Sequence, residues 1–416
     1  MNPDVLVGWL DLCEEDQRQA RAYLTRMKQE GTLDELGFGI LRNAFAEKFF
    51  PATNTIMTRT RYLMFIPALY RKIEEERLSG EQAARRLKSL EDELRVQLEK
   101  TGEDGVIGSV AKESLRRYPS SIYWNALRQL GIFLRDWTQG YYQAHLSQFY
   151  AAMRLLRDDD GSAHLAGDGQ GNWDPEFDGL EVLGKGETFL RTARFGLTRA
   201  EARYMEGKFA AVGESLLAHL VSRQYTADFD YPWEVPCPPA LRGHVEHARF
   251  LSMLAKGATL HYYNLLCRAQ HAMGRCDAPS LMADAFCRWW SVAHGDLARW
   301  GLDEFTGIAA QMKAVRANDL GFFEGWLKAC LSAGRGEDLL ADKQAETMIR
   351  RHESIKRQHK ARLSHPDYLR NWKPPNPTDG LFADERHVPY WFDFRSPIGG
   401  TVVREIVSGL KGKADV

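Results

Sequence analysis

The sequence predicts a mainly α-helical protein with several helical lobes and a few short strands. Three observations support this fold class. Helix-start motifs recur along the chain, apolar residues repeat at helical spacing, and runs that alternate apolar with polar residues are scarce. No internal repeat of 30–45 residues is evident. We therefore expect non-repeating helices that pack around ordinary apolar cores.

Helix starts are marked by pairs in which Ser, Thr or Asp precedes Glu or Gln by three residues. In such a pair, each side chain can bind a free backbone amide at the start of a helix. The pairs are Asp11–Glu14, Thr32–Glu35, Ser79–Gln82 and Thr198–Glu201.

Two long helices are predicted from apolar periodicity. After Ser79, one stripe recurs every three or four residues, with charged residues between its members. The stripe consists of Ala83, Leu87, Leu90, Leu94 and Leu98. A second, buried helix is predicted over residues 244–273, where Gly257 would allow close packing against a neighbour. Short strands are predicted only within residues 179–189 and 387–395.

Breaks in composition divide the chain into four parts. A Gly- and Asp-rich linker (residues 158–192) separates an N-terminal helical domain (1–157) from a central helical domain (193–371). The Pro-rich stretch "WKPPNPTDG" then introduces a C-terminal segment (372–416).

Charge and composition bound the function. The 416 residues carry 55 Lys and Arg against 56 Asp and Glu, so nucleic-acid binding requires a local basic surface rather than an overall positive field. Six Cys residues without a C-x-x-C pair fit a reducing cytoplasm. The chain shows neither a basic leader followed by an apolar run nor an apolar stretch of 18 residues, so we expect no membrane partner.

No catalytic, cofactor or metal-binding motif is apparent. The Gly-rich stretches "GDGQGNW" and "GKGET" lack phosphate-loop spacing, and no nucleophile motif is present. His244 and His247 are three residues apart, but the His and Cys residues that follow are too irregularly spaced to indicate zinc. An enzyme whose site forms only in three dimensions stays open as an alternative, with these histidines and nearby acids as candidates.

Residues 110–132 fit two interpretations. In the first, a helix–turn–helix presents Tyr123, Asn125 and Arg128 to a nucleic-acid groove, and Arg116 and Arg117 contact phosphates. In the second, the two helices form a hairpin that packs its apolar residues inward. Packed hairpins are common and nucleic-acid readers are a minority of them, so the second is favoured.

The most basic stretch is residues 348–365, which hold six Lys and Arg against one acid, Glu353. Helical spacing predicts that four of the cations lie along one side of a helix, with Arg351 beside them. These four are Arg350, Lys356, Arg357 and Lys360. The stretch is either a solvated helix face or a surface that binds phosphate or a protein partner.

Arg59 and Arg61 alternate with threonines in "TNTIMTRTRY", residues 53–62. Guanidinium and hydroxyl groups at a helix N-terminus can hold an anion, which makes both arginines candidate binding residues. The same groups fit an internal network with acids such as Glu47, and this interpretation is favoured.

Several segments resemble an uncharacterised bacterial family whose members occur in phage-defence gene neighbourhoods, beside helicases and phospholipase-D-like nucleases. The resemblance is clearest at "GWLD" (8–11) and "TIMTRTRYLMF" (55–65), and continues in "YPSSIYWNALRQLGI", "FLSMLAKGATLHYYNLL" and "IKRQHKARL". Near the C-terminus Asp393, Phe394 and Arg395 match the family's Asp-aromatic-Arg-Trp string, while Ser396 replaces the Trp. The family has no catalytic motif to carry over.

The resemblance and the basic stretches together predict a non-enzymatic accessory or scaffold subunit of an antiphage defence system. The expected partners are DNA or RNA and a helicase or nuclease subunit. A purely structural adaptor is the other alternative.

Overall fold

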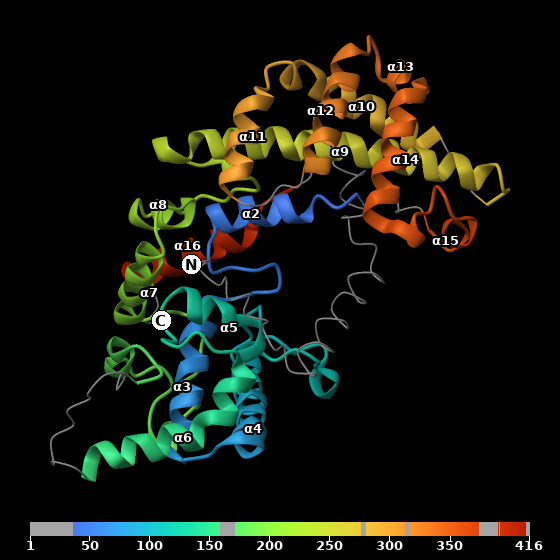
Figure 1. Cartoon of the computed structure of the whole chain (residues 1–416). Coiled ribbons are helices and arrows are strands. Elements are labelled where there is room, and N and C mark those ends of the chain that lie inside the picture. Colours follow the sequence, from blue (N-terminus) through green and yellow to red (C-terminus); the bar gives the residue numbers. More distant parts are fainter. Residues whose placement is uncertain are drawn as a thin grey trace, which may run out of the picture. The chain divides into compact units, whose positions relative to one another are not determined.

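A computed structural model describes residues 36–158, 171–275, 280–312, 317–373, 390 and 392–412. It is 67% helical, which confirms the mainly α fold (Figure 1). Within the described residues, strand pairing is limited to an isolated bridge between Phe133 and Trp173. The helix starts predicted at Asp11 and Thr32, the "GWLD" motif, and residues 387–389 and 391 of the strand predicted at 387–395 lie outside these residues. The described part of that segment forms no strand, because positive φ at Phe394 and Arg395 makes a turn there.

The chain divides into two compact units, each described here by itself. Unit 1 comprises Met1–Leu41 and His247–Trp391, and unit 2 comprises Arg42–Glu246 and Phe392–Val416. Each unit joins segments that are far apart in the sequence, an arrangement that breaks in composition do not reveal. Two of the three boundaries fall within helices, α2 (Gly39–Phe49) and α9 (Arg242–His271), and the third lies between residues 391 and 392.

Besides most of α2, unit 2 contains further helices, and short 3-10 helices lie between some of them. The further helices are α3 (Tyr62–Glu75), α4 (Gly80–Lys100), α5 (Pro119–Gln129), α6 (Gln139–Asp158), α7 (Arg199–Ala211), α8 (Leu216–Ser222) and, from the C-terminal segment, α16 (Ser396–Leu410).

Helix α16 packs against α7 and α8 and is largely buried in unit 2. Its glycines permit this close packing. A Cβ at Gly399 would lie 2.1 Å from the Phe50 ring, and one at Gly409 would lie 2.7 Å from Ala202. The helix follows a tight turn in which Phe394 and Arg395 both have positive φ, and Phe394 is buried against Phe45 and Phe49.

A cluster of aromatic side chains forms the second part of the unit 2 core. Its ring centroids lie 4.6–6.1 Å apart, within the range of favourable aromatic contacts. The cluster consists of Tyr70, Trp124, Phe133, Tyr142 and Trp173. The described part of the Gly- and Asp-rich stretch, residues 171–192, therefore packs into the core through Trp173.

Several local predictions for unit 2 are confirmed. Helix α4 begins after Ser79, and the five apolar residues predicted to form its stripe are all buried. Thr198 and Glu201 form the predicted capping box of α7. At Ser79 the helix start is correct, but its side chain makes no capping hydrogen bond.

Two local predictions were wrong. Residues 110–118 form turns and a 3-10 helix (Lys112–Ser114), so α5 has no preceding α-helix and the helix–turn–helix is not formed. Gly108 and Lys112 both have positive φ, which an α-helix does not accommodate. The strand expected at 179–189 is replaced by turns and a 3-10 helix (Gly186–Thr188), with positive φ at Gly184 and Gly186.

Unit 1 is built on α9. It also contains α10 (Ser280–Leu297), α11 (Leu302–Gln311), α12 (Ala317–Ser332), α13 (Gly336–Ala341), α14 (Lys343–Arg357) and α15 (Pro366–Arg370). As predicted, residues 244–271 are helical, and Gly257 allows close packing: a Cβ there would lie 2.1 Å from the Trp289 ring. Trp289 and Trp326 each donate an indole hydrogen bond to an α9 carbonyl, of Met253 and Leu254 respectively.

Candidate nucleic-acid interface

Helix α14 carries most of the basic stretch, and its cations have different environments. Arg351 is exposed and makes no ion pair within the described part of the chain. The Arg350 side chain is 39% exposed and pairs with Glu346 at 2.9 Å. Lys356 is only 16% exposed and pairs with Asp319 on α12, so it is tied to the unit 1 core.

The buried carboxylate of Glu353 organises the chain that follows α14. Its oxygens accept hydrogen bonds from the Tyr262 hydroxyl (2.6 Å) and from the backbone amides of Arg362 (2.6 Å) and Leu363 (3.1 Å). Burying a carboxylate is unfavourable unless its oxygens are satisfied, and here three donors satisfy them. The turn bearing Arg362 is thereby held against α14 and α9.

Further hydrogen bonds join the basic segments directly. Arg350 donates to the Leu363 carbonyl at 3.1 Å, and Arg357 donates to the Lys360 carbonyl at 3.3 Å. At the C-terminal end of α9, Arg275 donates to the Arg370 carbonyl at 3.3 Å. The cations of α14, of the following turn and of the α9 end thus belong to adjoining surface segments.

We call this region the basic surface. It is formed by exposed and half-exposed cations from three segments: Arg268 on α9 with Arg275 just after that helix, Arg350, Arg351 and Arg357 on α14, and Lys360, Arg362, Arg370 and Lys373 after α14. Residues 343–373 hold nine Lys and Arg against three acids. One of these acids, Glu353, is buried, and Glu346 is paired with Arg350 and Lys343. Asp367 is exposed and lies 3.5 Å from Arg370.

His352 contributes no charge to this surface near neutral pH. It is buried on α14, its Nε2 bonds the Leu36 carbonyl at 2.8 Å, and its ring stacks on Phe322. Burial lowers the pKa of His352 to about 4, because the cationic form would lose its hydration. The ring is therefore neutral and packs residues 36–38 onto α14.

Arg59 and Arg61 belong to unit 2, whereas the basic surface belongs to unit 1. Arg61 is buried, donates to Glu201 at 2.9 Å and donates to the Arg194 carbonyl at 2.8 Å. Arg59 pairs with Glu405, and its guanidinium lies 4.4 Å from the centre of the Phe195 ring. Both charges are compensated within the unit, but not by Glu47, which pairs with Arg395 instead. An anion would have to displace the carboxylates of Glu201 and Glu405.

The three arginines predicted near α5 also lie in unit 2. Arg128 pairs with Asp136, Arg116 is exposed and Arg117 is half-buried. Tyr123, which the groove-reading interpretation requires at the surface, is buried and donates to the Arg59 carbonyl at 2.8 Å. Without a preceding helix and with Tyr123 turned inward, α5 does not present a recognition face.

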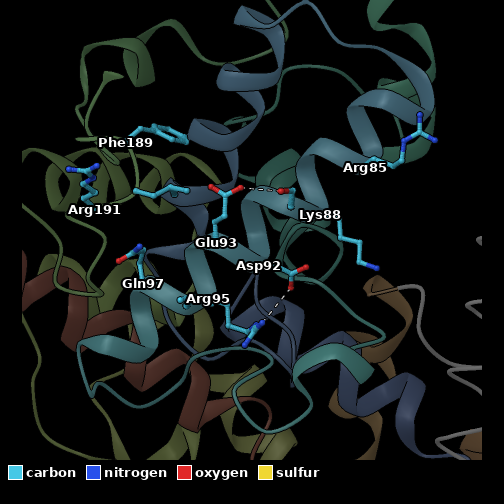
Figure 2. Close-up of a pocket in the computed structure, with 11 residues that line it drawn as sticks. Arg85, Lys88, Asp92, Glu93, Arg95, Gln97, Phe189 and Arg191 are labelled. Atoms are coloured by element: carbon cyan, nitrogen blue, oxygen red, sulfur yellow. Dashed lines mark hydrogen bonds and ion pairs between the residues drawn. The ribbon is translucent and has the colours of Figure 1, made fainter. Parts of the chain in front are cut away.

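Sequence reasoning missed a groove of about 750 Å³ on α4, where Phe189 and Arg191 lie opposite the helix (Figure 2). Charges of both signs line it. Glu93 accepts from Ser89 at 3.0 Å, and Arg95 lies 3.8 Å from Asp92. The groove therefore offers mixed charge, whereas the basic surface has one exposed acid, Asp367, among its cations.

The histidines considered as metal ligands have other contacts. Nδ1 of His247 accepts a hydrogen bond from the Trp300 indole at 2.9 Å, and the ring is buried. His261 is buried between Phe286 and Trp326. No group of three or more His, Cys, Asp or Glu residues in the described ranges is arranged to hold a metal ion.

The fold and the basic surface define a helical protein with a predominantly cationic face on a chain whose total charge is near zero. Within the described ranges, no helix is long and apolar enough to cross a membrane. The chain belongs to the "Family of unknown function (DUF6361)", whose model matches residues 5–382. Neither a curated protein nor a solved structure shows a significant match to it.

Proposed function

We propose that this protein is a non-enzymatic accessory subunit of a bacterial antiphage defence system, which binds nucleic acid through the basic surface and works beside a helicase or nuclease. The observation that carries the nucleic-acid part is the gathering of nine cations from three segments around one exposed acid. The defence setting and the protein partners rest on the resemblance of "TIMTRTRYLMF" and related segments.

Electrostatics supports phosphate as the target of this surface. Each phosphate that a cation neutralises releases condensed counterions, which favours binding at low salt. Arginine also matches a phosphate with two parallel N–H groups. Several basic-surface residues, including Arg351 and Lys360, make no ion pair within the described residues, so they can bind phosphate without first breaking one.

The test is the salt dependence of binding after two cations are removed. We expect Arg351→Ala with Lys360→Ala to weaken binding of a fluorescent oligonucleotide at low salt. The slope of log K against log salt should fall by about 1.4–1.8, since each lost phosphate contact contributes about 0.7–0.9. Fluorescence anisotropy at several salt concentrations between about 50 and 200 mM measures both the affinity and the slope.

The matched control is Lys328→Ala with Arg335→Ala. These two cations also lie in unit 1, are 72% and 73% exposed and cause the same change in net charge. Equal slopes for both double variants would remove the basic surface from the proposal. If the parent protein shows no salt-dependent binding, the nucleic-acid proposal fails and the structural-adaptor alternative remains.

The partner half of the proposal needs a separate measurement. The protein should co-purify with a helicase or nuclease encoded beside its gene. Treating the complex with nuclease before purification distinguishes a direct protein contact from a bridge made by nucleic acid. Recovery of the protein alone, with or without that treatment, would contradict an accessory-subunit role.

A further inference from the structure

We infer that the basic surface takes single-stranded nucleic acid and that Tyr368 on α15 stacks on an unpaired base. This inference rests on the proposed function and specifies its ligand. It comes from an aromatic side chain that the electrostatic argument does not use. Tyr368 is 42% exposed, although its neighbour Leu369 is buried.

Hydrogen bonds and ring packing hold the backbone around Tyr368 against the rest of unit 1. The amide of Gln270, itself buried, donates to the carbonyls of Leu369 (2.9 Å) and Trp372 (2.6 Å). The buried Trp372 ring also lies 5.7 Å from the Tyr263 ring. A ring on a fixed backbone loses little entropy when a base stacks on it, which makes it a suitable platform.

Cations flank the ring in the sequence and on the surface. Arg370 and Lys373 are exposed on the same short segment, and Arg275 donates to the Arg370 carbonyl. Single-strand binding sites have two components: cations that bind the nucleic-acid backbone and an exposed aromatic ring that stacks on a base. On α14, Ile355 is 43% exposed one helical turn after Arg351 and adds apolar surface for a base.

A duplex would not use Tyr368. Its bases stack on each other and expose only their edges, so a ring at the surface cannot contact a base face. The groove-reading alternative also lacks a recognition helix, since α5 buries Tyr123. The combination of cations with an exposed, fixed ring thus favours unpaired strands of either DNA or RNA.

The experiment compares Tyr368→Leu with the parent protein on three probes: oligo-dT, oligo-U and a mixed-sequence DNA duplex of equal length. We expect the parent to bind a single strand more tightly than the duplex. Tyr368→Leu should lose about tenfold in single-strand affinity, as expected for one stacked base, with an unchanged salt slope. Tyr368→Trp should keep or increase that affinity. The two single strands show whether DNA or RNA is preferred.

The matched control is Tyr141→Leu, which removes a 48%-exposed tyrosine from unit 2 and should leave all affinities unchanged. Equal binding of duplex and single strand, together with no effect of Tyr368→Leu, would overturn this inference and leave the proposed function intact. Failure of the parent to bind any probe would instead overturn the proposed function.

Discussion

Glu91 is a buried carboxyl group that occupies the N-terminus of α5. Its oxygens accept from the Ser120 amide at 2.7 Å and the Ser120 hydroxyl at 3.1 Å, and Gln139 extends the network to Tyr70. These hydrogen bonds favour the ionised form, but no cation pairs with the group in the network described. Burial dominates and raises the pKa of Glu91 to about 8.

The raised pKa makes the stability of unit 2 depend on pH. The folded state prefers protonated Glu91, so its contribution is fully present below the unfolded pKa near 4.5 and is lost as pH rises through about 8. The loss is on the order of 4 kcal/mol. Glu91→Gln should remove it, so that the variant is more stable than the parent at pH 8.5 but not at pH 5.

Urea unfolding at both pH values checks this prediction. The difference between variant and parent isolates Glu91 from other groups that titrate in the same range. An equal pH dependence in the two proteins would show that the carboxyl group is already ionised and accommodated in the folded state.

Arg59 and Arg61 show how far the sequence alone predicts the partners of single residues. Residue types alone indicate that two arginines among threonines will bind carboxylates or another anion. They do not choose between these, because Glu201 is 140 residues from Arg61 and Glu405 is 346 residues from Arg59. The same limit applies to Lys356, whose partner Asp319 lies on another helix.

Elements whose signals are local were predictable from the sequence. The α4 stripe, the length of α9 and the Thr198 capping box each depend on spacing within one or two helical turns. The helix before α5 was predicted wrongly because positive φ at Lys112 is a property of the packed chain and leaves no signal in residue type. Placement of the α9 end beside α15 was missed for a similar reason, since Gln270 reaches carbonyls about 100 residues away.

Helix α16 offers an element-scale prediction. Gly399→Ala should destabilise the protein by roughly 1–3 kcal/mol, because a Cβ would lie 2.1 Å from the Phe50 ring and force rearrangement. Gly207→Ala is the control. Gly207 is an exposed glycine inside α7 with no atom near its Cβ position, so alanine should add up to about 1 kcal/mol through helix propensity.

Urea unfolding of both variants measures these opposite effects. Equal stabilisation by the two alanines would mean that α16 does not pack as closely on Phe50 as described.

At the scale of the whole molecule, unit 2 depends on residues from both ends of its sequence range. The mainly α class was predictable from composition and periodicity. The joining of Phe392–Val416 to Arg42–Glu246 was not, because nothing in the composition of α16 names its neighbours. "SPIGGTVVREIVSGL" indicates only that a helix with small residues will pack closely against something.

A chain that ends at residue 391 should therefore lose the structure of unit 2 and keep that of unit 1. Without α16, the apolar faces of α7 and α8 are exposed to water. Amide hydrogen exchange should increase in α7 and α8, while α9 and α12 stay protected. A chain that ends at residue 412 is the control and should match the parent. Protection of α7 in the shorter chain would contradict this dependence.

The position of α16 in the sequence also determines when the core of unit 2 can be completed during synthesis on the ribosome. Residues 42–246 of unit 2 are made before residues 247–391 of unit 1, so the apolar surface that α16 covers stays open while residues 247–391 are made. Only after α16 has left the exit tunnel can Phe50, Ala202 and Phe229 acquire their glycine partners. The nascent chain thus carries an uncovered hydrophobic site from the completion of α8 until α16 emerges, and unit 2 is completed last.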